Sequence, residues 1–240
     1  MMSETGARIH DIQATLEAHS QRWGRAPEIL AVTKTVAPDQ ILSIRGSGIT
    51  RLGENRVQEL LQKRPQIDAS FTFHLIGRLQ TNKVKYIIDQ VALIESLDRL
   101  SLAEEIDRRA QRANRRMPVL IQVNIGRERQ KGGIPEEELL RFARDLTSYP
   151  GLCVQGLMAV MPESTDEQVL RPLFRRMRTL FEALRDAAFS GTEIRTLSMG
   201  MSGDYALAAE EGATQVRLGS AIFGARTPKQ ATDQQGRVFG

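Results

Sequence analysis

Cysteine, aromatic residues and long apolar runs are all scarce in this sequence of 240 residues. Its one cysteine, Cys153, cannot form an internal disulfide, which fits a reducing compartment, and we expect it to be an inert part of the core. No apolar run approaches the ~18 residues that a membrane-spanning helix needs, and the N-terminal segment contains no apolar signal core. We therefore expect a cytoplasmic protein with no membrane partner.

The charge balance excludes some partners. The chain has 33 Lys and Arg against 29 Asp and Glu, a formal net charge of +4. The arginines are scattered over presumed helices and alternate with acids, as is typical of solvated helix faces. A nucleic-acid interface needs a basic stripe with interleaved aromatic residues, and aromatic residues make up only 5% of the chain. No His, Cys or acidic residues have the spacing of metal ligands, so we expect neither a nucleic-acid partner nor a metal site.

Eight short apolar runs rich in β-branched residues alternate with stretches of helical period. We expect strands at residues 28–34, 49–54, 71–77, 92–97, 118–125, 153–160, 194–200 and 215–224, each except the last followed by a helix. This alternation predicts parallel βα units, and eight strands close a (β/α)8 TIM barrel, whose usual length is ~250 residues. The predicted fold is α/β, a single barrel domain over residues 1–240, with an additional N-terminal helix at about 4–23 and a mobile tail at about 227–240.

A doubly wound open sheet is the alternative that fits the same alternation. It would need a glycine-rich phosphate fingerprint after the first strand, and residues 33–38 read TKTVAP instead. The barrel is therefore the preferred fold. Its functional site should form where the C-terminal ends of the strands meet.

Lys34 is the first candidate for that site, because it closes an apolar strand. Partial desolvation lowers the pKa of a lysine and raises the fraction of neutral amine, which attacks aldehydes to form a Schiff base. The structural alternatives are a side chain that reaches out to the rim of the barrel, or an ion pair with Glu54.

Two glycine-rich loops offer a phosphate site. The segment LSMGMSGDY contains Ser198 and Gly200, and the segment RLGSAIFG contains Gly219 and Ser220. Loops after the seventh and eighth strands are a frequent phosphate site in barrels, since glycine allows close backbone approach and helix N-termini attract anions. The alternative is a set of ordinary turn glycines and helix caps. A phosphate on one wall and an amine across the mouth suggest a phosphorylated aldehyde as the ligand.

Three further polar residues lie in or after the predicted strands. Arg217 interrupts an apolar strand and needs an acceptor, which a ring nitrogen, a carboxylate or a barrel acid would supply. His74 alternates with apolar neighbours and is either a hydrogen-bonded core residue or part of the site. Asn55 follows the second strand and either caps the next helix or contacts a ligand.

Seven motifs follow one another in register with the predicted strands from about residue 28 to 226: LAVTKT, RLGENRVQE, HLIGRLQTNK, VLIQVNIGRERQKGGI, GLMAVMP, LSMGMSGDY and VRLGSAIFGAR. Together they resemble the pyridoxal phosphate homeostasis protein family, also described as alanine racemase N-terminal-domain-like proteins. The resemblance implies that Lys34 binds pyridoxal 5′-phosphate as an internal aldimine. It also implies that Arg217 faces the pyridine nitrogen and that Asn55 and His74 lie in the pocket near the ring. The phosphate contacts that it implies come from Ser198, Gly200, Gly219 and Ser220.

The resemblance implies a protein of intracellular cofactor homeostasis that holds, buffers and delivers pyridoxal 5′-phosphate, with dependent apo-enzymes as recipients and no catalytic residues assigned. An arginine at the ring nitrogen makes the ring a poorer electron sink, which agrees with a carrier. The alternative is a weak amino-acid racemase. Only residues 227–240 follow Arg226, whereas a racemase carries its tyrosine base with a second, β-rich domain. A barrel that binds a phosphorylated sugar is a more distant alternative.

Two further expectations concern the family pattern and the assembly. Many family members have another lysine two positions after the aldimine lysine, where this chain has Val36. Transfer of the cofactor would then depend on another group in this protein. Because the cofactor site is complete within one chain, we expect a monomer.

Overall fold

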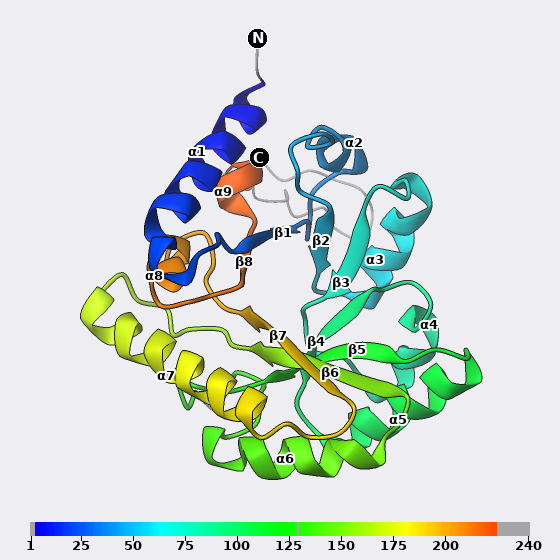
Figure 1. The fold of residues 1–240 in the computed structure, drawn as a ribbon. Coiled ribbons are helices and arrows are strands. Elements are labelled where there is room, and N and C mark those ends of the chain that lie inside the picture. The colour runs from blue at the N-terminus through cyan, green and yellow to red at the C-terminus, as the bar shows by residue number, and fades with distance from the viewer. Residues whose placement is uncertain (1–2, 129, 225–240) are drawn as a thin grey trace.

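Eight parallel strands form a closed barrel in which each strand pairs with the next and β8 pairs with β1. The computed structural model describes residues 3–128 and 130–224 (Figure 1). Each predicted run overlaps one strand, so the α/β barrel is confirmed. The strands are β1 Glu28–Val32, β2 Arg51–Glu54, β3 Thr72–Leu75, β4 Leu93–Leu97, β5 Met117–Gln122, β6 Leu152–Met158, β7 Thr192–Ser198 and β8 Gln215–Leu218.

Helices surround the strands on the outside of the barrel (Figure 1). Short 3-10 turns at 21–23, 64–66, 81–83, 136–138 and 146–148 supplement them. Within the described residues, none of the helices has the length and apolar character needed to cross a membrane. The helices are α1 Glu4–His19, α2 Pro38–Leu42, α3 Val57–Lys63, α4 Val84–Ile87, α5 Leu100–Arg112, α6 Leu139–Asp145, α7 Glu167–Asp186, α8 Tyr205–Glu210 and α9 Ser220–Phe223.

Helix α7 shows how the sequence pattern builds the outer layer. Its buried residues are spaced by three or four positions, so they form one apolar stripe along the helix: Leu170, Phe174, Met177, Phe181 and Leu184. This stripe packs against β6 and β7, while the arginines between its members face outward. The side chain of Asp166 begins the helix by accepting a hydrogen bond of 2.8 Å from the backbone N–H of Gln168.

The predicted strand at residues 215–224 is wrong in its second half. Strand β8 ends at Leu218, and residues 220–223 form α9, so a short helix follows the last strand too. The backbone leaves the extended conformation at Gly219, where φ is −114° and ψ is −79°. The N–H groups of Gly219 and Ala221 then donate to the hydroxyl of Ser202 instead of to a neighbouring strand.

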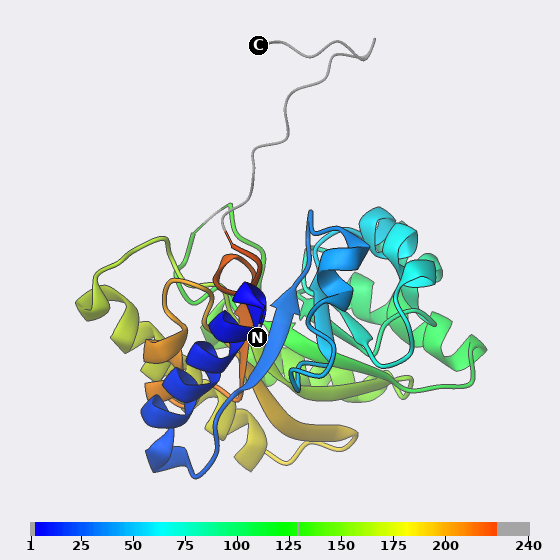
Figure 2. The ribbon, with the colours of Figure 1, turned by 90° about the horizontal axis from the view of Figure 1, so that it is seen from above.

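The N-terminal helix is present but shorter than predicted. Helix α1 ends at His19, where the hydroxyl of Ser20 donates to the carbonyl of Leu16 over 2.6 Å, and a 3-10 turn occupies the last predicted residues. Its apolar side packs near α8 and α9, on the outside of the barrel (Figures 1 and 2). The predicted mobile tail at about 227–240 lies outside the described residues.

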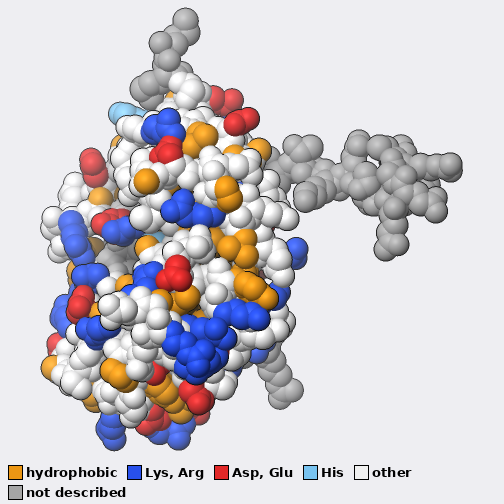
Figure 3. Space-filling view, turned by 90° about the vertical axis from the view of Figure 1, so that its right-hand side faces the viewer, with side chains coloured by type: hydrophobic (Ala, Val, Ile, Leu, Met, Phe, Trp, Pro, Cys, Tyr) orange, Lys and Arg blue, Asp and Glu red, His pale blue; other side chains and the backbone are white. Residues whose placement is uncertain are grey.

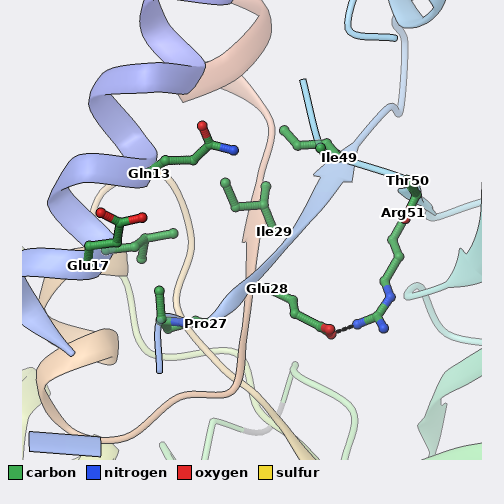
Figure 4. Close-up of a pocket in the computed structure, with 11 residues that line it drawn as sticks. Gln13, Glu17, Pro27, Glu28, Ile29, Ile49, Thr50 and Arg51 are labelled. Carbon is green, nitrogen blue, oxygen red and sulfur yellow. Dashed lines mark ion pairs between the residues drawn. The ribbon is translucent and has the colours of Figure 1, made fainter. Parts of the chain in front are cut away.

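A groove of about 280 Å³ separates part of α1 from the first two strands. Gln13 and Glu17 of α1 face Ile29 and Ile49 across it, and an ion pair between Glu28 and Arg51 lies at one side (Figure 4). This groove lies near the N-terminal ends of β1 and β2, away from the ends at which barrel sites form.

Truncation of the α7 stripe tests this account of the outer layer. Phe174 is fully buried, so we expect Phe174→Ala to lower the free energy of unfolding by about 3–5 kcal/mol through lost apolar contacts and a cavity. Val169 lies on the same helix but is 47% exposed, so Val169→Ala should change the free energy of unfolding by less than about 0.5 kcal/mol. Urea unfolding measures both, and equal losses in the two variants would contradict the packing described.

Candidate functional site

Lys34 lies just beyond the C-terminal end of β1, where its side chain is half-buried. Strand β1 pairs with β8 on one side and with β2 on the other. The loop after β8, which begins at Gly219, and the loop after β2, which begins at Asn55, therefore flank Lys34. The barrel thus brings together an amine and two loops that are far apart in the sequence.

Helix α3 holds the backbone on both sides of Lys34. The ammonium group of Lys63 donates to the carbonyl of Thr33 over 2.6 Å, and the carboxylate of Glu59 accepts the backbone N–H of Thr35. Lys63 also donates to Glu59 over 2.7 Å, so one lysine links both contacts. Thr35 has a φ of +65°, an uncommon conformation for a residue with a side chain. These contacts fix the turn that carries Lys34.

Glu54 is fully buried beneath this turn and has Lys63 as its basic partner at 2.8 Å. The hydroxyl of Thr33 donates to the same carboxylate oxygen over 2.6 Å. Burial raises the pKa of Glu54 above its ordinary value, although the hydrogen bonds from Lys63 and Thr33 oppose that shift. Glu54 thus has a basic partner in Lys63, a residue that the sequence patterns did not single out.

The loops after β7 and β8 are bound to each other. The hydroxyl oxygen of Ser202 accepts the N–H of Gly219 over 3.3 Å and that of Ala221 over 3.2 Å. Gly200 has a φ of +92°, and a Cβ there would lie 2.5 Å from the Cβ of Ala208, so only glycine fits. Ser220 begins α9 and is exposed. Two backbone donors thus converge on one oxygen atom at this edge of the barrel.

Ser198 has its hydroxyl inside the barrel, within a network of buried polar side chains. This hydroxyl donates to Glu95 of β4 over 2.6 Å, and Gln215 of β8 donates to the same carboxylate over 2.8 Å. Nδ1 of His74 lies 2.8 Å from Glu95, and an ionised carboxylate only accepts, so the shared proton is on Nδ1. His74 is thus a hydrogen-bonded residue of the barrel interior.

Arg217 reaches the same network from β8. Its guanidinium donates to the carbonyl of Ser198 over 2.8 Å, to the hydroxyl of Ser198 over 2.9 Å and to the carbonyl of Ala159 over 2.7 Å. Burial lowers the pKa of Arg217, and the negative charges of Glu95 and Asp204 oppose that shift. The barrel acid considered as a partner for Arg217 is Glu95, to which it is linked through Ser198.

Glu95 is the centre of this network and was missed in the sequence. Burial by itself would raise its pKa, but hydrogen bonds from His74 and Ser198 and the charge of Arg217 outweigh burial and hold it below the ordinary 4.5. A charged residue in the apolar run VALIESL was the available signal, because a buried carboxylate must have partners.

Asn55 and Cys153 complete the sequence candidates. Asn55 is half-buried, and a Cβ at Gly77 would overlap its backbone carbonyl, so the ends of β2 and β3 approach closely. Cys153 is buried in β6, and burial raises the pKa of its thiol, as expected of an inert core residue. Within residues 3–128 and 130–224, no three His, Cys, Asp or Glu side chains are grouped so that they could hold a metal ion.

Comparisons with known proteins agree with this architecture. The family model "Alanine racemase, N-terminal domain" matches residues 8–227. A pyridoxal phosphate homeostasis protein from Aquifex aeolicus is 41% identical over 223 residues, which are 91% of this chain and 97% of that protein. The structure of PipY from Synechococcus elongatus PCC7942 with pyridoxal 5′-phosphate bound has a TM-score of 0.81 at 29% identity, and covers 92% of this chain and 100% of that one.

An alanine racemase from Clostridium difficile has the same barrel at 14% identity, with a TM-score of 0.73. The match covers 92% of this chain but 56% of the racemase, and at this identity it shows the fold alone. Fold and site thus define a barrel of the alanine racemase N-terminal-domain class. The chain belongs to the pyridoxal phosphate homeostasis protein family.

Glu95→Gln tests the interior network. Loss of the carboxylate removes the larger of the two negative charges that act on the buried Arg217, so we expect the free energy of unfolding at neutral pH to fall by about 3–5 kcal/mol. Glu105 pairs with Arg108 and Arg109 on the surface of α5, and Glu105→Gln should cost less than about 1 kcal/mol. Urea unfolding of both variants checks this, and a matching small loss for Glu95→Gln would contradict it.

The pH dependence of that loss has a defined sign. The pKa of Glu95 is lower in the folded state than its ordinary 4.5, so the unfolded state binds the proton more tightly. The stabilisation is complete above pH 4.5 and is lost as the pH falls through the lower folded pKa. The difference in unfolding free energy between wild type and Glu95→Gln should therefore shrink below pH 4.5, and growth of the difference there would contradict the assignment.

A double-mutant cycle tests the pair beneath Lys34. Lys63→Met leaves Glu54 buried without its cation, and we expect a loss of about 3–5 kcal/mol in the free energy of unfolding. In Lys63→Met with Glu54→Gln the unpaired charge is gone, so much of that loss should be recovered. Strictly additive losses in urea unfolding would show that the two residues do not act as a pair.

Proposed function

We propose that this chain binds pyridoxal 5′-phosphate at the C-terminal ends of its strands and holds it for delivery to dependent apo-enzymes. The observation that carries the proposal is the placement of Lys34, a half-buried residue at the end of β1, between the strands that lead into the loops after β2 and β8, whose flanking backbone is held by α3. The names of the relatives and the cofactor in PipY support the choice of ligand.

The residues at this end of the barrel fit the cofactor. The N–H groups of Gly219 and Ala221 already converge on one oxygen, that of Ser202, so the same loop can receive a phosphate oxygen. The main chain at Gly200 leaves no room for a side chain, and Ser220 is exposed beside it. When bound, the cofactor supplies an aldehyde electrophile and a visible chromophore.

Each remaining candidate has a proposed task. Lys34 binds the aldehyde carbon covalently, Asn55 contacts the bound molecule from the β2 side, and Arg217 faces the ring nitrogen. Gly200, Gly219 and Ser220 bind the phosphate. Ser202 joins them because its hydroxyl contacts the N–H of Gly219. Ser198 and His74 act through Glu95, whose negative charge balances the cationic Arg217 from within the barrel, while Ser198 links the two side chains.

An arginine at the ring nitrogen supports a holding role. The cationic guanidinium disfavours a protonated ring nitrogen, so the ring withdraws electrons less strongly and carbanion chemistry is slowed. The interior contacts of Arg217 keep it charged and in place. A cytoplasmic location and a monomeric state belong to this proposal as well.

Reductive trapping tests the proposal. The protein is incubated with pyridoxal 5′-phosphate, reduced with borohydride and digested, and the modified peptide is located by mass spectrometry. We expect the adduct on Lys34, since this lysine lies just beyond the C-terminal end of a barrel strand. Lys34→Ala should lose this adduct, whereas Lys85→Ala, an exposed lysine of α4, should keep it.

The same experiment can also contradict the assignment of Lys34 or the proposed function. An adduct spread over several surface lysines, with Lys34 unmodified, would contradict the assignment of Lys34. Circular dichroism controls for the fold of each variant. Absence of any adduct and of any absorbance from bound cofactor in the wild type would contradict the proposed function as a whole.

A further inference from the structure

A second groove, of about 770 Å³, lies at the same end of the barrel as Lys34. The loops after β2, β3 and β4 form its walls, and Asn55 lies at its edge toward β1. Four of the ten residues that line it are basic: Arg56, Arg78, Lys83 and Arg99. Among the described residues, no acidic side chain lines it.

Within the part of the chain that the structure describes, three of these cations have no partner. Among residues 3–128 and 130–224, none forms an ion pair or a hydrogen bond with the side chains of Arg56, Arg78 or Lys83. Arg99 is different, because Asp98 and the carbonyl of Leu79, each at 2.6 Å, hold its guanidinium. Unpaired like charges in one groove repel each other, and an anion would relieve that repulsion.

Many other arginines in the described part of the chain, unlike these three cations, have an acidic side chain as a partner. Arg171, for example, contacts the carboxylates of Glu167, Glu210 and Glu211 at 2.7–2.8 Å. Many other surface arginines likewise have an acid beside them, among them Arg108, Arg175 and Arg178. Figure 3 shows both blue and red side chains on the side of the molecule that carries α3 to α5, with several blue ones adjoining in its lower part. Other exposed cations such as Arg112 and Arg144 also have no acidic partner among the described residues, but Arg56, Arg78 and Lys83 line one groove beside the proposed cofactor site.

The shape of the groove favours a protein partner over a small molecule. Sites for small molecules bury most of the ligand surface, but Arg56 and Arg78 are exposed and Lys83 is only half-buried. Exposed cations of this kind steer an acidic surface into contact and set its orientation. The lining amides of Gln58 and Gln80 can hydrogen-bond to carboxylates or to a main chain.

We infer that this groove docks an acidic surface segment of the protein that accepts the cofactor. The inference rests on the proposed function for the identity of the partner, because a protein seated in the groove lies next to Asn55 and the mouth that holds Lys34. Docking there would bring the acceptor site close to the cofactor before release.

The test uses a groove variant, Arg56→Gln with Arg78→Gln and Lys83→Gln. Its matched control is Arg112→Gln with Arg144→Gln and Lys85→Gln, which removes the same charge from exposed positions on α5, α6 and α4. Binding of a fluorescein-labelled oligoglutamate peptide is measured by anisotropy. We expect affinity about tenfold weaker in the groove variant than in wild type, near-wild-type affinity in the control, and weakening of wild-type binding by salt.

Transfer is measured with the same three proteins, loaded with pyridoxal 5′-phosphate. Recovery of activity by a cofactor-stripped aminotransferase of acidic net charge reports the rate, and loading is read from absorbance. We expect normal loading in all three proteins and slower transfer from the groove variant alone. An oligouridylate competitor should not displace the peptide.

Each contrary result is distinct. Equal peptide affinity in the groove and control variants would overturn the docking surface, whatever the cofactor does. Displacement of the peptide by low concentrations of oligouridylate would overturn the acidic-protein partner in favour of RNA. If the groove variant binds the peptide weakly but transfers the cofactor at the wild-type rate, the acceptor protein is not the partner of the groove. Failure of the wild type to load would instead contradict the proposed function, and the peptide measurement would still test the groove.

Discussion

The barrel depends on one buried charge, the carboxylate of Glu95, and on the side chains that compensate it. Full burial of an isolated carboxylate is very costly, so β3, β7 and β8 must each place a donor or a cation beside β4. His74, Ser198 and Gln215 supply the hydrogen bonds, and Arg217 supplies the positive charge. These contacts run across the interior of the barrel, so they fix the strands relative to one another. They also set the position of the arginine proposed to face the cofactor ring.

A second buried pair performs a similar task nearer the mouth. Glu54 and Lys63 are both buried, and the ammonium group of Lys63 also donates hydrogen bonds to the carbonyl of Thr33 and to Glu59. The turn that carries Lys34 is thereby held from beneath and from the side. Beside it, the loops after β7 and β8 hold each other through Ser202. A holding protein needs such a mouth, because a fixed amine and a fixed phosphate loop lose little freedom when the cofactor binds.

The pattern of apolar runs predicted the eight strands because burial on both faces imposes an apolar run wherever a parallel strand occurs. It also predicted that Lys34, Asn55 and the glycine loops would gather at one end, since all strands of the barrel point the same way. The prediction was wrong at residues 215–224, where an apolar run continues past the strand. Gly219 turns the chain there, and the apolar residues that follow belong to α9. Apolar character alone could not separate the end of a buried strand from the start of a short buried helix.

By itself, the sequence determined the barrel class, the order of its elements and the end of the barrel at which the site forms. These follow from periodicities that span a few residues and from the fixed direction of parallel strands. Only the tertiary structure decided that Glu54 pairs with Lys63, that the hydroxyl of Ser198 faces inward to Glu95, and that Arg56, Arg78 and Lys83 share one groove. Ser198 and Glu95 are 103 residues apart, and which polar side chains meet across a barrel depends on strand register and rotamers rather than on local sequence.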